Sequence, residues 1–206
     1  MRPILLLFLT AATAAAAPKP AVVTETRPVP AFHGLAVETV VDIELAIGPT
    51  TRVEVTAPKD FLPTLETKVI DGSLHIATPN VKGKLPDVKV TITTPSLDAI
   101  AIAGVAKIHA VKLGASSLAI AVDGAGNLDL SGKATELEIA VSGALQLQAK
   151  DLVVQTSAVQ VSGTCSGTLD VRKSLAAAIS GVGNLVVYGK PSVTRSISGI
   201  GTIEER

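Results

Sequence analysis

The sequence predicts an all-β protein: a right-handed parallel β-helix, or β-solenoid, with about 18–20 residues per coil. Three observations predict this fold. A short glycine-centred motif recurs six times in the second half of the chain, and apolar and polar residues alternate on both sides of each glycine. No stretch after Leu97 keeps the apolar spacing of an amphipathic helix for more than one turn. Alternation with a period of two indicates strands that bury one face.

The recurring motif sets the length of the coil. Its six versions read IAIAGVAKI, IAVDGAGNL, IAVSGALQL, VQVSGTCSG, AAISGVGNL and RSISGIGTI. Their first glycines, the predicted structural glycines, are Gly104, Gly124, Gly143, Gly163, Gly181 and Gly199. A nearly fixed period indicates units that stack on their nearest neighbours. A sandwich of hairpins is the competing all-β interpretation, because half of this period fits the spacing of hairpin turns.

The first glycine of each repeat has inward parity. Glycine suits a bend, since it adopts backbone conformations that other residues avoid, and it also suits a place too narrow for a side chain. The second inward position is replaceable, and it reads Ala106, Gly126, Leu145, Cys165, Gly183 and Gly201. We therefore expect a bend at the first glycine and a packing limit at the second.

The residue before each first glycine has outward parity and forms a candidate surface ladder. After Ala103, these positions are Asp123, Ser142, Ser162, Ser180 and Ser198. Stacked one coil apart, they form either a hydrogen-bonded row of hydroxyls that a repeating ligand could match or a row that is simply solvated. Both interpretations stay open.

The N-terminal segments predict an exported protein. Residues 1–17 combine Arg2, an apolar run from Ile4 to Leu9 and an alanine-rich cleavage region, which together indicate a signal peptide. The apolar run is too short to span a membrane, and no transmembrane segment is expected in the mature chain. We expect the protein in the periplasm, at the cell surface or outside the cell. Residues 18–30 are Pro-rich and predict an extended tether.

Residues 31–96 are predicted to form an antiparallel β module that caps the coils of residues 97–206. Four segments of this module alternate apolar and polar residues, and Asp71-Gly72 in VIDGSLHI is a hairpin signal. A solenoid needs such a cap because an open end exposes strand edges and core.

Composition argues against several kinds of chemistry. The chain carries 18 basic and 18 acidic residues and is 2% aromatic, which does not indicate nucleic-acid binding. Cys165, the only cysteine, has no partner for an internal disulfide. The GTCSG stretch around it has the spacing of a nucleophile elbow, but the following residues continue a strand pattern, so we expect a buried small apolar side chain.

The titratable residues show no catalytic or metal-binding pattern. The histidines lie far apart and are interpreted as scattered surface residues: His33, His75 and His109. Three acids fail to share one phase of the repeat: Asp129, Asp151 and Asp170. The sequence therefore predicts no catalytic residues, no metal and no cofactor.

The order of motifs resembles a known family. FHGLAV, VIDGSLHI, VTITTPSL, the serial SGxG repeats and YGKP followed by SGIG are similar to the family named putative auto-transporter adhesin, head GIN domain. The similarity covers residues 31–203 as a single domain. It implies a β-helical, exported bacterial domain without an assigned catalytic site. Leu145 and Cys165 depart from the pattern by replacing the second glycine, which concerns packing.

Together these observations predict a non-catalytic, exported cell-envelope domain that acts in adhesion or surface interaction. Its expected partner is an unidentified polysaccharide or protein of the envelope or the extracellular space. One alternative is a polysaccharide lyase or hydrolase on a β-helix scaffold. The other is a self-assembling structural protein, because only Glu204, Glu205 and Arg206 are available as charges that block stacking at the last coil.

Overall fold

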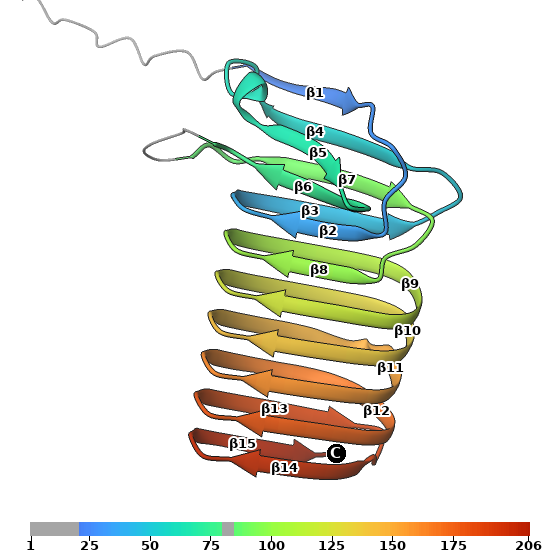
Figure 1. Ribbon diagram of the computed structural model, residues 1–206, viewed down its shortest axis with the longest axis vertical. Helices are drawn as coiled ribbons and strands as arrows, with labels where there is room; N and C mark the ends of the chain where they lie inside the picture. Colours follow the sequence, from blue (N-terminus) through green and yellow to red (C-terminus); the bar gives the residue numbers. More distant parts are fainter. Residues whose placement is uncertain (1–20, 80–84) are drawn as a thin grey trace, which may run out of the picture.

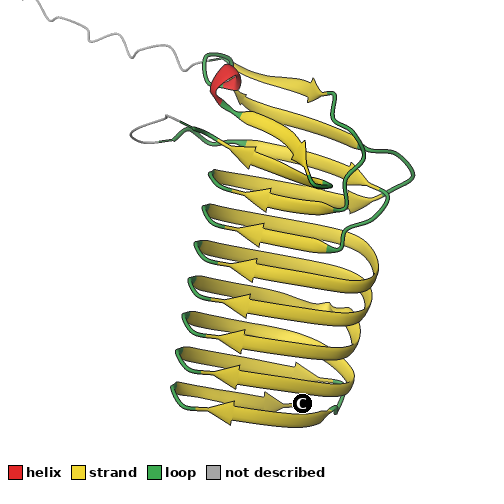
Figure 2. Cartoon of the chain, viewed as in Figure 1, coloured by secondary structure: helices red, strands yellow, loops and turns green. Residues whose placement is uncertain are grey.

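The structure, a computed structural model, describes residues 21–79 and 85–206, and these are almost entirely β-strand (Figures 1 and 2). The predicted signal peptide lies outside the described residues. Within the described ranges, no helix is long and apolar enough to span a membrane. The part of the chain that the structure describes contains one short 3-10 helix, η1 (Leu62–Thr64). The strands are β1 (Val22–Arg27), β2 (Gly34–Val37), β3 (Val40–Ile47), β4 (Arg52–Pro58), β5 (Glu66–Ile70), β6 (Ser73–Ala77), β7 (Lys89–Thr94), β8 (Ala99–Ile102), β9 (Val105–Val122), β10 (Ala125–Val141), β11 (Ala144–Val161), β12 (Thr164–Ile179), β13 (Val182–Tyr188), β14 (Ser192–Ile197) and β15 (Ile200–Glu205).

The repeats form a stack of flattened coils, which confirms the predicted β-solenoid. Each of β9 to β12 crosses one sheet, bends through an arc and returns across a second sheet (Figure 1). Neighbouring coils pair in parallel: Leu128 lies between Ile108 and Leu147 in the ladder. All pairings among β9 to β15 are parallel, which rules out a sandwich of hairpins.

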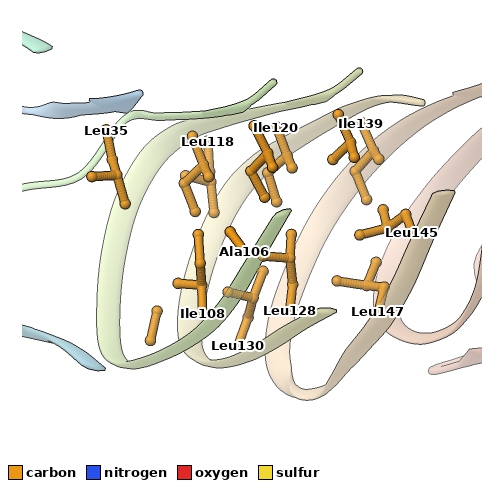
Figure 3. Packing of buried hydrophobic residues seen from close by; sticks show 14 of the residues in the cluster. Leu35, Ala106, Ile108, Leu118, Ile120, Leu128, Leu130, Ile139, Leu145 and Leu147 are labelled. Atoms are coloured by element: carbon orange, nitrogen blue, oxygen red, sulfur yellow. The ribbon is translucent and has the colours of Figure 1, made fainter. Parts of the chain in front are cut away.

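The coils build two facing sheets. The first sheet contains β1, β4, β7, β3, the first halves of β9 to β12, then β13 and β15. The second sheet contains β5, β6, β2, β8, the second halves of β9 to β12, then β14. Aliphatic side chains from the two sheets meet between them, as Figure 3 shows for Leu118 and Ile120 above Ile108 and Leu128. The core is therefore a continuous aliphatic column along the stack.

A tight turn at each repeat motif joins the second sheet to the first. At one such turn, the backbone N–H groups of Ser142 and Gly143 both donate to the Val122 carbonyl, at 2.9 and 3.1 Å. The Ala144 N–H donates to the Gly124 carbonyl at 2.9 Å. The same three bonds recur at the other turns of the repeat. The turn edge is thus held by backbone groups.

The structure corrects the predicted reason for the first glycine. Positive φ values among the described glycines occur at Gly72, Gly132 and Gly189, so the repeat glycines do not need a special backbone conformation. A Cβ atom added to Gly143 would instead overlap the carbonyl oxygens of Gly124 and Asp123 in the preceding coil. Glycine is required because neighbouring backbones approach closely at the turn.

The second inward position is limited by side-chain packing, in agreement with the sequence. A Cβ atom at Gly126 would lie 3.2 Å from Cδ1 of Ile102 and 3.3 Å from Cδ1 of Leu145, which are flexible side-chain ends. Leu145 and Cys165 occupy the same row and are buried. The position therefore accepts larger residues where the neighbouring coil leaves room.

The opposite edge of each coil is a wider arc, where the coils differ in length. The register between β10 and β11 shifts between Asp129 and Ser131, and the register between β11 and β12 shifts between Ala149 and Val153. The turn edge shows no such shift in these pairs. Differences in coil length are therefore absorbed in the arc.

The N-terminal module is mixed rather than antiparallel. Its β5–β6 hairpin turns at Asp71 and Gly72, whose φ values of 50° and 75° fit the predicted tight turn. However, β2 and β3 pair in parallel with β8 and β9 and so form a first coil. Thr39 stands where later coils have glycine, and its buried side chain bonds to Oγ1 of Thr78 at 2.7 Å. The solenoid therefore begins near Gly34, before residue 97.

The predicted tether is also corrected, because most of its described part is a strand. Val22–Arg27 forms β1 and pairs antiparallel with β4. The guanidinium of Arg27 donates to the Leu62 carbonyl at 2.8 Å. Pro28 and Pro30 follow this strand, and β1 lies at the sheet edge, where flanking prolines are tolerated.

Candidate binding surfaces

The predicted surface ladder lies at the turn edge of the second sheet. Its side chains are exposed and lie one coil apart at Asp123, Ser142, Ser162, Ser180 and Ser198. Parallel strands are spaced by about 4.8 Å, which sets the repeat of the row. Backbone hydrogen bonds connect the coils here, so the hydroxyls are free to meet solvent or a ligand.

The second sheet beside the ladder is flat and lined by small side chains. The next outward column contains Ala101, Ala121, Ala140, Gln160, Ala178 and Ser196. A shallow hollow of about 370 Å³ lies over Ala101 and Ala121 and reaches Asp123 and Ser142. Methyl groups dominate its floor, so it offers a ligand few directional hydrogen bonds.

The first sheet presents a longer and more polar depression that the sequence analysis did not identify. Three hollows lie along it, with volumes of about 420, 250 and 450 Å³. They adjoin, because Asn127 lines the first two, Gln146 the last two, and Asp129 both the first and the last. We call this continuous depression, from Lys89 on β7 to Asn184 on β13, the polar groove.

Parallel pairing places the groove side chains in two columns. One outward column contains Lys89, Asp42, Lys107, Asn127, Gln146, Ser166 and Asn184. The column beside it contains Thr91, Glu44, His109, Asp129, Gln148 and Thr168. Residues two apart on a strand face the same side, so the strand alternation that builds the core also builds these columns.

The N-terminal half of the groove is charged. Nζ of Lys89 lies 2.7 Å from Oε1 of Glu44, and Nδ1 of His109 lies 3.1 Å from Oδ2 of Asp129. The hydrogen bond from Lys89 is the largest cause that lowers the pKa of Glu44. Burial acts in the opposite direction, and the charges of Lys89 and His109 lower this pKa further. Basic and acidic side chains therefore alternate between neighbouring strands in this half.

The two outward columns are rich in amides and hydroxyls in the C-terminal half of the groove, where Lys150 and Asp151 also line the hollow. Nδ2 of Asn127 donates to Oε1 of Gln146 at 3.4 Å. Oγ1 of Thr202 donates to Oδ1 of Asn184 at 3.0 Å. Each amide offers both donors and acceptors, so these side chains can bind neutral polar groups.

Each histidine lies near a carboxylate from another segment of the chain, which the sequence analysis missed. The other two pairs are His33 with Asp98 at 3.7 Å and His75 with Glu38 at 3.4 Å. One signal was available, since Asp129 follows His109 by 20 residues, the length of one coil. Across residues 21–79 and 85–206, no three His, Cys, Asp or Glu side chains gather in a way that could hold a metal ion.

Two further residues with reactive or ionisable side chains, Cys165 and Asp170, are buried. Cys165 is buried in the core, and burial raises the pKa of its thiol to about 11, so the thiol stays protonated at neutral pH and is unsuited to act as a nucleophile. Asp170 is also buried, and its Oδ2 accepts a bond from Nη2 of Arg172 at 2.6 Å. This pair packs near the arc, outside the groove lining.

Comparisons with known proteins agree with the fold. The family model described as putative auto-transporter adhesin, head GIN domain matches residues 31–191. Among curated proteins no match is found.

Solved structures of bacterial proteins share the architecture. A putative adhesin from Bacteroides fragilis is 22% identical with a TM-score of 0.76, and the match covers 92% of this chain and 99% of that one. A putative adhesin from Parabacteroides distasonis is 19% identical with a TM-score of 0.51, covering 91% and 98%. A putative lipid binding protein from the same species is 14% identical with a TM-score of 0.51, covering 90% and 96%. At these identities the similarity concerns the fold alone.

Proposed function

Because the chain belongs to the family described as putative auto-transporter adhesin, head GIN domain, we propose that it is an exported, non-catalytic adhesion module. It acts in the cell envelope and binds a polysaccharide or protein at the surface or outside the cell. The signal-peptide pattern of residues 1–17 supports export.

The continuous polar groove is the observation that supports this function best. Its two columns present polar side chains at one coil spacing across the strands from β7 to β13. A polymer with repeated polar groups can contact several coils at once, and many weak contacts on one rigid surface add to a strong attachment. The groove is open and exposed, as an extended ligand requires.

The exposed serine ladder is the second candidate surface for the same function. It lies on the opposite sheet, so a ligand cannot occupy both surfaces through one contact. The groove offers charged and amide groups, whereas the ladder offers mainly hydroxyls beside alanine. We therefore place the principal contact in the groove.

Matched double variants distinguish the two surfaces. N127A/Q146A removes two amides from the groove, and S162A/S180A removes two hydroxyls from the ladder. Retention of the mature chain would be measured on immobilised peptidoglycan, lipopolysaccharide, alginate, hyaluronate and fibronectin. Losing two hydrogen bonds should weaken retention by about tenfold or more in the groove variant, and the ladder variant should stay within about twofold of wild type.

The opposite ranking would move the site to the ladder, and equal retention of all three proteins would contradict both surfaces. Release of new reducing ends from the polysaccharides, assayed in the same samples, would support an enzyme instead. Circular dichroism of each variant provides the control for folding, because all four substituted side chains lie on the outer faces of the sheets.

A further inference from the structure

The C-terminal end of the solenoid presents two strands with one free edge each. In the described residues, β14 pairs only with β12, and β15 pairs only with β13. The N–H and C=O groups along the other edges have no strand beside them (Figure 1). Free edges of this length are templates for pairing with another chain.

Apolar side chains gather at this end. Ile197 is 39% exposed, whereas the equivalent Ile179 one coil earlier is buried. Ile200 is 77% exposed at an outward position, where the equivalent Val182 is already 42% exposed. Ile197 occupies the inward position that Ile179 holds one coil earlier, and among the described residues no strand covers its other side. The end therefore combines unpaired backbone with an uncovered edge of the core.

The inward rows end in charged residues of opposite sign. On β14, Arg195 takes the inward position that Ala177 and Val159 hold in earlier coils. On β15, Glu205 takes the inward position of Val187. Both side chains are exposed. A further apolar coil would cover these charges without giving them partners, whereas an edge that brings an opposite charge beside each of them would not.

We infer that two copies of this chain associate tail to tail through their last coils, with β14 of each copy paired antiparallel to β15 of the other. A two-fold axis along the strand direction produces this arrangement. With Arg195 opposite Ile203 of the second copy, Glu205 of the second copy becomes its diagonal neighbour, within reach of long side chains. The symmetry creates this ion pair twice.

Charge selects this arrangement over the other two-fold arrangement. An axis perpendicular to the sheets would pair β14 with its own copy and place Arg195 beside Arg195 of the second copy. In the chosen arrangement, the outward side chains of β14 that face β15 are Ser192, Thr194 and Ser196, which do not repel Glu204.

The association is self-limiting and weak. Both C-terminal ends are consumed in one isologous contact, so the product is a dimer and not a filament. The contact involves two strands on each copy, at the lower end of the size range for specific interfaces, so we expect a dissociation constant in the micromolar range. The polar groove remains open in the dimer, since it lies along the outer face of the first sheet.

Charge reversal tests the arrangement. The mature wild-type chain would be studied by analytical ultracentrifugation from about 5 to about 500 μM, where a micromolar dimer passes from mostly monomer to mostly dimer. R195E and E205R should each dimerise about tenfold or more weakly, because each places like charges side by side twice. The double variant R195E/E205R restores opposite charges and should dimerise like wild type.

Mixing provides the decisive measurement. R195E and E205R are each monomeric alone at a concentration where wild type is dimeric, but together they form a dimer in which both pairs are complementary. Circular dichroism verifies that each variant is folded. A wild-type mass that stays monomeric across the range, a mass that grows beyond two copies, or single variants that fail to complement each other would each overturn the inference.

Discussion

The substitution Gly143→Ala is expected to destabilise the solenoid because the added methyl group collides with the preceding coil. Its Cβ would lie 2.5 Å from the carbonyl oxygen of Asp123 and 2.8 Å from the carbonyl carbon, and closer still to the carbonyl oxygen of Gly124. All of these atoms belong to the backbone, so no side chain can move aside. The two coils must separate at the turn.

The cost follows from the hydrogen bonds that hold this turn. Separation weakens the bonds from Ser142 and Gly143 to Val122 and from Ala144 to Gly124. At about 1 kcal/mol each, their loss lowers the free energy of unfolding by about 3 kcal/mol. Urea denaturation followed by circular dichroism would measure the difference.

Gly114→Ala is the matched control, because a Cβ at Gly114 meets nothing within 4 Å. It should leave stability unchanged or raise it by about 0.4–1 kcal/mol through a less flexible unfolded chain. If Gly143→Ala and Gly114→Ala had the same free energy of unfolding within about 0.5 kcal/mol, the close-approach argument would be refuted.

Further predictions concern titration, burial and export. Burial raises the pKa of the Cys165 thiol from 9.0 to about 11, so at pH 8 a thiol reagent should label the folded chain at least about 100-fold more slowly than the urea-unfolded chain. The same shift lowers the free energy of unfolding as pH rises from 9 towards 11. Equal labelling rates of the folded and unfolded chains would contradict both statements. Lys89 is the main cause that lowers the pKa of Glu44 below its usual 4.5, so the small contribution of the Glu44 carboxylate to stability is present above pH 4.5 and is lost as pH falls through the lowered pKa. NMR titration of Glu44 should place the midpoint below 4.5 in wild type and nearer 4.5 in K89M. Arg172→Met leaves the nearly buried carboxylate of Asp170 without its cation and should lower the free energy of unfolding by about 1–3 kcal/mol. The control Arg52→Met removes an exposed ion pair with Glu54 and should lower it by about 0–0.5 kcal/mol. Equal losses in the two variants would refute the role of burial. N-terminal sequencing of the chain recovered from outside the cytoplasm should begin near Ala17, and an intact Met1 there would contradict the predicted signal peptide.

The coils could be predicted from the sequence because each repeat contains the alternation of apolar and polar residues around a glycine. The alternation of Leu118, Ile120 and Val122 through Gly124 reappears from coil to coil and predicts the stack, and the parallel pairing in the structure excludes the hairpin sandwich that half of the period also fits. The first coil was missed because Thr39 replaces the glycine there. The close approach that requires glycine arises only when an earlier coil is present, and Thr39 instead contacts Thr78.

The groove could be predicted only in part. His109 and Asp129 are one period apart, so their contact follows from the repeat. Lys89 and Glu44 come from strands of the N-terminal module, where no period relates one strand to the next. Their meeting depends on the order β7, β3, β9 across the sheet, which is a long-range pairing that local sequence does not specify.

The wide arc gives this chain an asymmetric tolerance of insertions and deletions. The turn edge admits no change of length, since its glycines fit against the backbone of the coil before. The arc accommodates coils of different length through the register shifts between Ala149 and Val153. Loops or epitope tags inserted near Lys150 should therefore be accepted, and homologous chains can lengthen along this edge while both sheets keep their alignment.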